Sequence, residues 1–157
     1  MTTPDLVRQI LAAIEETERL ARAVVSTINP TTGEWVAAGE HGTEIRDSRG
    51  HLVVKHSWPD EIAHITRHDP ASVLRRCTAD RALIAEVTGW KHVECEDGWY
   101  SCSQAPSWND PTPGAGCANE DRAGQPCDCG LESRQLDILR ALADSYGVAP
   151  ATSPEHS

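Results

Sequence analysis

Phenylalanine is absent from this 157-residue sequence and methionine occurs once, so the apolar core has to be built from leucine, isoleucine, valine and five tryptophans. No apolar stretch approaches the roughly 20 residues that a transmembrane helix needs. The first ten residues, MTTPDLVRQI, also lack the basic segment and apolar run of a signal peptide. These absences predict a cytoplasmic protein without a membrane partner, in which cysteines are more often metal ligands than disulfides.

Basic residues are scarce as well, because 14 lysines and arginines face 24 aspartates and glutamates, for a formal net charge of −10. An acidic protein is repelled by phosphate backbones, so we expect no binding to nucleic acid, and in particular none to duplex DNA at physiological salt. The acidic residues are interspersed with lysines and arginines, a pattern that indicates a solvated surface rather than mimicry of nucleic acid.

The N-terminal half shows the pattern of a long helix followed by three short strands. Thr3 is a candidate N-cap with Pro4 at the first helical position. The apolar stripe that follows predicts an amphipathic helix to about Val25, with these residues on one face: Leu6, Ile10, Ile14, Thr17, Ala21 and Val24. Runs bounded by glycines then predict an antiparallel meander that lays one face on this helix, with strands at Trp35–Ala38, Thr43–Arg46 and Leu52–Lys55.

Two helices follow the meander. The first is predicted over Pro59–His68. Asp69 and Pro70 suit the N-cap and the first position of the next helix, which runs to about Thr88. Cys77 falls within its apolar stripe, so we interpret this cysteine as a small core residue.

The last predicted helix is Leu131–Tyr146, ended by Gly147. Mixed helices and a small antiparallel sheet indicate an α+β fold. The length of the chain and its hydrophobic share of 39% are those of an ordinary globular domain. We therefore predict one domain over residues 1–147 and a disordered tail over residues 148–157.

Between Gly89 and Gly130 glycine, proline, aspartate, asparagine and serine dominate, and regular periodicity disappears. A long irregular loop in a compact domain requires something that offsets the entropy of ordering it. Five of the six cysteines fall in this segment: Cys95, Cys102, Cys117, Cys127 and Cys129. Because four thiolates in a tetrahedron form a structural zinc site, we predict one Zn²⁺ that ties the loop together.

The cysteine spacing leaves the ligand set open, because the chain has no Cys-x-x-Cys pair and five cysteines compete for four places, with His92 as a further competitor. The preferred set is Cys102, Cys117, Cys127 and Cys129, with Cys95 as the first reserve. The aromatic residues nearby are interpreted as a small satellite core, the alternative being an aromatic binding surface: Trp90, Trp99, Tyr100 and Trp108.

Two stretches carry a resemblance to a known family. One is HITRHDPASVL, residues 64–74; the other runs from WYSCSQ, residues 99–104, through GAGC, residues 114–117, to QPCDCG, residues 125–130. They resemble an uncharacterised family, the domain of unknown function numbered 6221, found in actinobacteria and their phages. The likeness extends from the first helix to Tyr146. The family has no established activity, substrate or partner, so the resemblance implies none.

One short motif is similar to the signature of the zinc deaminases, His-x-Glu followed by Pro-Cys-x-x-Cys. In those enzymes the histidine and two cysteines hold zinc and the glutamate moves the proton of the activated water. Here the second cysteine comes one residue early, which changes the geometry of the ligands. A zinc hydrolase of deaminase type is therefore kept as the alternative function, with these residues in the site: His92, Glu94, Cys127 and Cys129.

His64 and His68 lie four residues apart on one predicted helix face, with Asp60 one turn earlier, a spacing that suits a metal or acid–base site. The plainer interpretation is a polar helix face, with His68 near a helix C-terminus where a cation is favoured. The sequence contains no glycine-rich phosphate loop and no serine elbow. It therefore favours a non-enzymatic, zinc-stabilised interaction or accessory protein of phage or prophage origin, with an unidentified protein partner.

Overall fold

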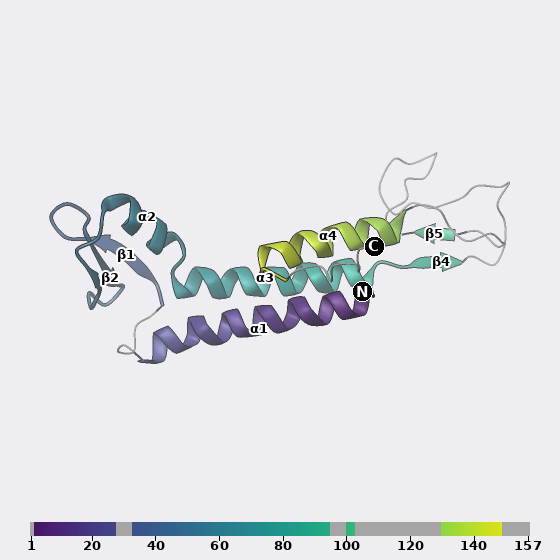
Figure 1. The fold of residues 1–157 in the computed structure, drawn as a ribbon, viewed down its shortest axis with the longest axis horizontal. Helices are drawn as coiled ribbons and strands as arrows, with labels where there is room; N and C mark the ends of the chain where they lie inside the picture. The colour runs from purple at the N-terminus through teal and green to yellow at the C-terminus, as the bar shows by residue number, and fades with distance from the viewer. Residues whose placement is uncertain (1, 28–32, 95–99, 103–129, 149–157) are drawn as a thin grey trace, which may run out of the picture. The chain divides into compact units, whose positions relative to one another are not determined.

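The structure, a computed structural model, describes residues 2–27, 33–94, 100–102 and 130–148, with the backbone alone for residues 26–27, 93–94 and 100–102. Its elements confirm an α+β fold (Figure 1): α1 (Thr3–Thr27), β1 (Trp35–Ala38), β2 (Glu44–Asp47), β3 (Leu52–Lys55), α2 (Pro59–Arg67), α3 (Pro70–Gly89), β4 (His92–Glu94), β5 (Tyr100–Cys102) and α4 (Leu131–Ser145). The chain divides into two compact units, residues 10–81 and residues 1–9 with 82–157. Compactness does not decide whether they unfold together, so the single domain stays a prediction.

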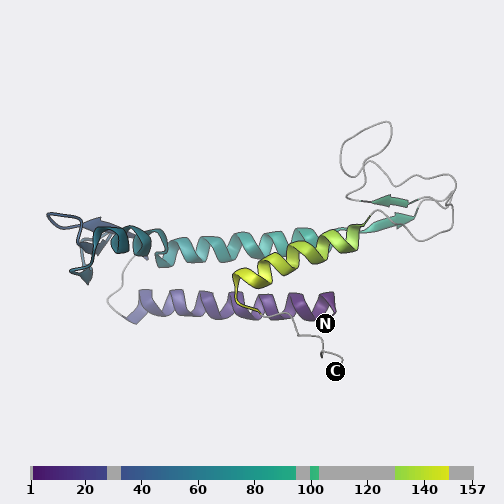
Figure 2. The same cartoon turned by 45° about the horizontal axis from the view of Figure 1, so that its top comes forward.

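In the unit of residues 10–81, α1 and α3 run antiparallel and lie side by side in both views (Figures 1 and 2). An ion pair joins them, with Arg81 Nε 3.2 Å from Glu18 Oε1. The predicted apolar stripe of α1 is confirmed here, since Ile10 and Ile14 are completely buried. Cys77 is also buried, at 1% exposure, as expected of a core residue.

The three predicted strands form one antiparallel sheet in the order β1-β2-β3. Ala37, Ile45 and Val54 pair across it, and Ile45 is completely buried. The helix in closest contact with β1 and β2 is α2, which buries Ile62 and lies beside the sheet in Figure 1. The sequence predicted α1 for this place; α2 takes it because the chain passes from β3 into α2 after three residues.

The second strand, Glu44–Asp47, lies one residue later at each end than predicted. Asp47 stays in the ladder opposite Trp35 and is buried, so it is a strand residue rather than a turn residue. Its carboxylate accepts hydrogen bonds from the backbone N–H groups of Arg49 (3.0 Å) and His51 (2.7 Å). Burial acts to raise the pKa of Asp47, but the bonds from His51 and Arg49 together hold it below its ordinary value of 3.8.

Asp69 joins the sheet to the start of α3. Its carboxylate accepts the backbone N–H of Ser72 (2.6 Å), which confirms the predicted N-cap, and also that of Trp35 (3.2 Å) in β1. Beside it, the carbonyl of Gly33 accepts the N–H of Ala71 at 3.0 Å. Gly33 has a φ of 75°, a region that favours glycine, so the close approach of the two segments depends on this residue.

In the unit of residues 1–9 with 82–157, the described core comes from three helices. Leu139 of α4 and Val87 of α3 are completely buried, and the other core positions are Leu6, Ile84, Leu131 and Ala143. The predicted inner residues Leu136 and Leu142 are half-buried. α4 therefore turns a slightly different face inward than its leucine spacing indicated.

The helix ends agree with the sequence to within two residues. The N-cap of α1 is Thr2 rather than the predicted Thr3, because the Thr2 Oγ1 accepts the N–H of Asp5 at 3.3 Å and donates to its carboxylate at 2.6 Å. Gly147 ends α4 as predicted: its φ is 66°, and the next N–H, of Val148, bonds to the carbonyl of Ala143 at 2.9 Å.

The segment predicted to be irregular contains a hairpin, because β4 and β5 pair antiparallel. Each strand has three residues, too few for an alternating pattern to be recognised. Across the described ranges of the chain, no helix combines the length and apolar character that a membrane span requires.

Candidate metal centre

Most of the predicted zinc ligands lie outside the described residues: Cys95, Cys117, Cys127 and Cys129. Cys102 is the last residue of β5, where the backbone alone is described. Among the residues that the structure describes, no three His, Cys, Asp or Glu side chains are placed to hold a metal ion. The ligand set therefore stays a prediction, and the geometry that bears on it is that of the elements where the cysteine-rich segment begins and ends.

The β4–β5 hairpin sets the position of one candidate ligand. His92 pairs with Cys102 at one end of the hairpin, and Glu94 pairs with Tyr100 at the other. Residues directly opposite in an antiparallel pair have Cα atoms about 4.5–5.5 Å apart, so Cys102 lies close to His92.

His92 connects this hairpin to the start of α4. Its Nε2 lies 2.8 Å from Oε1 of Glu132, in the first turn of α4. The carboxylate accepts, so Nε2 carries the proton in this contact. The pKa of Glu132 lies below its ordinary value of 4.5, first because of a hydrogen bond with its own backbone N–H and then because of His92. The beginning of β4 and the beginning of α4 therefore meet at one point.

Gln135 makes a second connection one turn later in α4. Its Nε2 donates to the carbonyls of Val87 (2.7 Å) and Trp90 (3.2 Å), at and just beyond the end of α3. Carbonyls at a helix end lack the usual partner one turn ahead, so a side-chain donor stabilises them. The end of α3, the start of β4 and the start of α4 are thus held together where the cysteine-rich segment departs and returns.

Replacing Gln135 by glutamate removes these two N–H donors and sets a carboxylate against two carbonyl oxygens. We expect Gln135→Glu to lower the free energy of unfolding by about 1–3 kcal/mol, the cost of losing two part-buried hydrogen bonds and of placing a carboxylate against carbonyl oxygens. Urea unfolding followed by circular dichroism measures the difference.

The matched control is Gln9→Glu, the same change at an exposed position of α1. This variant is expected to change stability by less than about 0.5 kcal/mol. Equal effects of the two substitutions would contradict a role of Gln135 in holding α4 to the end of α3.

The remaining predicted positions are scattered. His64 and His68 are exposed at the end of α2, with ring centroids 4.6 Å apart, and Asp60 completes no cluster of three with them. Of the aromatic residues predicted to form a satellite core, Trp90 is half-buried and its Nε1 donates to Glu86 at 3.3 Å. The backbone of Tyr100 lies in β5, and two others fall outside the described residues: Trp99 and Trp108.

The contacts that organise this region were not predicted from the sequence. Glu132 and His92 are 40 residues apart, and Gln135 and Val87 are 48 apart. The available signal was a glutamate and a glutamine three residues apart in the first turns of a helix, which does not identify a partner. The burial of the Asp47 carboxylate, whose Oδ2 lies 3.1 Å from Nδ1 of His51, was not predicted from the sequence either.

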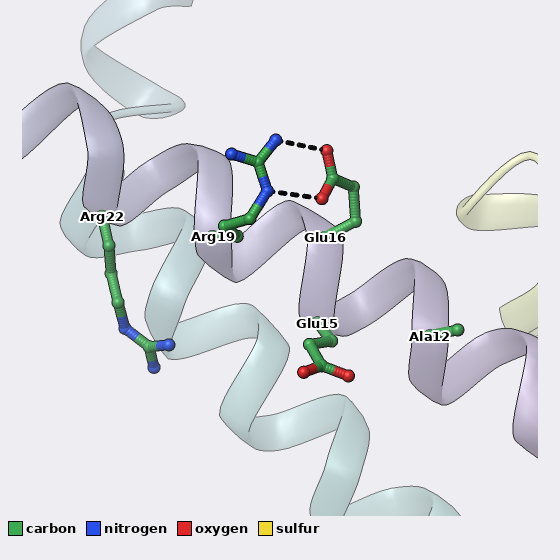
Figure 3. A pocket seen from close by; sticks show the side chains of 5 residues that line it. All are labelled: Ala12, Glu15, Glu16, Arg19 and Arg22. Atoms are coloured by element: carbon green, nitrogen blue, oxygen red, sulfur yellow. Dashed lines mark hydrogen bonds and ion pairs between the residues drawn. The ribbon is translucent and has the colours of Figure 1, made fainter.

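A hollow on the exposed side of α1 is the other concave feature considered (Figure 3). One helix supplies all of its lining residues: Ala12, Glu15, Glu16, Arg19 and Arg22. Glu16 and Arg19 already satisfy each other through two hydrogen bonds of 2.6 and 2.7 Å. Because its lining residues come from one helix rather than converging from several elements, the hollow has the character of a solvated surface.

Residues 3–151 match a family described as "Family of unknown function (DUF6221)". No curated protein and no solved structure matches the chain.

Proposed function

The chain belongs to the DUF6221 family, whose function is unknown, and from that premise we propose that it is a non-enzymatic, zinc-stabilised interaction or accessory protein of the cytoplasm. The proposal rests on the contacts that join β4 to β5 and to the start of α4, because the five candidate cysteines lie in β5 or in the connections between these elements.

The chemistry of the donors supports zinc. Soft thiolates prefer zinc over calcium or magnesium, which are bound by oxygen ligands. Thiolates must be deprotonated to bind, and zinc lowers their pKa enough for this at neutral pH. The preferred ligand set is Cys102, Cys117, Cys127 and Cys129.

The geometry of the flanking elements supports this choice of ligands. Cys129 precedes Glu132 by three residues, a length of chain that spans at most about 11 Å. Glu132 is in contact with His92, and His92 pairs with Cys102. This short length of chain allows Cys129 to reach the end of the hairpin where Cys102 lies, which is compatible with both residues as ligands. Cys95 stays the first reserve.

A site closed by four protein thiolates has no open position for water or substrate, which supports a structural rather than a catalytic metal. The partner is then expected to be another protein, since the net charge of −10 disfavours nucleic acid. A phage or prophage origin is part of the proposal and rests on the family resemblance alone. Capture of the partner from the native host and its identification by mass spectrometry test this part of the proposal.

The alternative, a hydrolase of deaminase type, draws on one specific observation. A histidine that binds zinc usually donates its other N–H to a carboxylate, and His92 donates to Glu132 in this way. In that arrangement the ligands are His92, Cys127 and Cys129, with Glu94 as the proton carrier. A three-ligand site with bound water would favour this alternative over a structural centre.

The purified protein is expected to contain about one zinc ion per chain, bound by four sulfur ligands. Elemental analysis of protein prepared without chelator gives the stoichiometry, and X-ray absorption at the zinc edge gives the number of sulfurs. Metal-free protein in which the five cysteines of the segment all titrate as free thiols would refute the proposal.

Serine substitutions then assign the ligands. Cys102→Ser and Cys129→Ser are expected to reduce bound zinc strongly, whereas Cys95→Ser, the matched control, retains about one ion per chain. If Cys95→Ser loses zinc and Cys102→Ser retains it, Cys95 is a ligand and Cys102 is not.

A further inference from the structure

We propose that His64 and His68 form a second, surface metal site that binds a late first-row transition metal ion such as Ni²⁺, Cu²⁺ or Zn²⁺. The two residues lie at the C-terminal end of α2, in the unit of residues 10–81, and are separate from the cysteine-rich segment. The proposal does not depend on the function proposed above.

The first support is the spacing and exposure of the pair. His64 lies in the last turn of α2 and His68 is its C-cap, so the two are one helical turn apart. Both side chains are exposed to solvent. Histidines at i and i+4 share a helix face, which is the arrangement that helical zinc motifs use for two of their ligands.

The second support is the separation of the two rings. Their centroids are 4.6 Å apart and their planes are inclined by 51°. With metal–nitrogen bonds of about 2.0–2.1 Å, two imidazoles that bind one ion at roughly a right angle have ring centres about 4.5 Å apart. The ring centres are therefore at about the separation that one shared ion requires.

The third support is electrostatic. The C-terminal end of a helix carries the negative end of the helix dipole, which favours a cation near His68. Imidazole nitrogen is a borderline ligand that suits nickel, copper and zinc rather than calcium or magnesium. Among the residues that the structure describes, no third ligand completes a cluster, so the other coordination positions are left to water.

One neighbouring residue competes with the metal. Nη2 of Arg76 lies 3.3 Å from Nδ1 of His68. A guanidinium only donates, so Nδ1 accepts and the ring proton of a neutral His68 is on Nε2. Metal binding through either nitrogen breaks this contact, because Nδ1 must either release Arg76 or take up the proton. Removing the guanidinium is therefore expected to strengthen metal binding.

The test is a Ni²⁺ titration of the untagged protein, prepared without added metal, at about pH 8, where an ordinary imidazole is neutral. Calorimetry measures the affinity, and NMR spectra of the histidine rings identify the site, because a bound paramagnetic ion broadens the signals of its ligands. The variants are His64→Gln, His68→Gln and Arg76→Ala, with His41→Gln, an exposed histidine in the turn between β1 and β2, as the matched control.

The expected result is one Ni²⁺ per chain that broadens the His64 and His68 signals. Each of the two glutamine variants binds on the order of tenfold or more weakly, Arg76→Ala binds more tightly, and His41→Gln is unchanged. Wild-type affinity in both His64→Gln and His68→Gln, or broadening confined to other histidines, would overturn the site, and weaker binding by Arg76→Ala would overturn the competition. Elemental analysis for zinc tests the cysteine site separately, so failure of the zinc proposal is distinguishable from failure of this one.

Discussion

Removal of zinc is expected to abolish the hydrogen-exchange protection of β4 and β5 while the elements of residues 10–81 stay protected. Those elements have buried apolar side chains of their own, such as Ile14, Ile45 and Ile62, so hydrophobic burial stabilises them without metal. The cysteine-rich segment has little apolar periodicity, and a structural zinc supplies folding free energy directly, about 10–16 kcal/mol in small zinc-binding peptides. Exchange measured by mass spectrometry with and without chelator gives the comparison.

After zinc removal, the two ends of α4 are expected to differ in hydrogen-exchange protection. Its first turn follows Cys129 directly and includes Glu132, so the amides there should lose protection with the metal. Its later turns carry the buried residues Leu139 and Ala143 and should retain more. Adding zinc back is the control and should restore protection.

Two results would contradict this prediction. Undiminished protection of β4 and β5 after chelation would mean that zinc does not stabilise this segment. Loss of protection throughout residues 10–81 would mean that the two halves of the chain unfold as one cooperative unit.

The second large effect is expected at Asp69. This residue is 6% exposed, and its carboxylate accepts N–H groups from both Ser72 and Trp35. Asp69→Ala removes the cap of α3 and leaves the N–H of Trp35 without an acceptor. Loss of a cap costs about 1 kcal/mol and a buried unpaired N–H about 1–3 kcal/mol, so we expect a total of about 2–4 kcal/mol. Urea unfolding provides the measurement.

Asp60→Ala is the matched control, since Asp60 is exposed in the first turn of α2. It should cost no more than about 1 kcal/mol, through its interaction with the helix dipole. If Asp69→Ala lowers the free energy of unfolding no more than Asp60→Ala does, Asp69 does not stabilise the contact between β1 and α3.

The contribution of Asp69 should also depend on pH. Burial acts to raise its pKa, but hydrogen bonds from Ser72 and Trp35 and the charge of Arg75 hold the pKa below its ordinary value of 3.8. A carboxyl with a depressed pKa in the folded state stabilises the protein above its unfolded pKa, and this is lost as the pH falls through the folded pKa. The stability of Asp69→Ala should therefore fall less than that of the wild type on acidification from about pH 5.

Local patterns were sufficient for most of the secondary structure. β1 and β3 were predicted residue for residue, and the Asp69-Pro70 pair correctly marked the start of α3. These signals act between neighbours in the chain: caps, proline at the first helical position, glycine at turns and apolar periodicity. The β4–β5 hairpin was missed because its strands are too short to carry a period.

For the candidate metal site, the sequence predicted the type of ligand but not which residues bind the metal. Five cysteines in an irregular segment indicate zinc, but their spacing does not select the four ligands. The structure adds that His92 pairs with Cys102 and contacts Glu132. No feature of the single sequence places these residues together, since the hairpin register and the docking of α4 depend on contacts between distant segments.

The sequence by itself determined the α+β class, the helices and the meander, and the core role of Cys77, because each follows from short-range stereochemistry or from composition. Tertiary structure alone decided that α2 rather than α1 lies closest to the sheet, that Asp47 is a buried strand residue, and that α3, β4 and α4 meet at Gln135 and His92. These outcomes depend on which apolar faces and unpaired backbone groups satisfy one another across the fold, and this requires all the segments to be present at once.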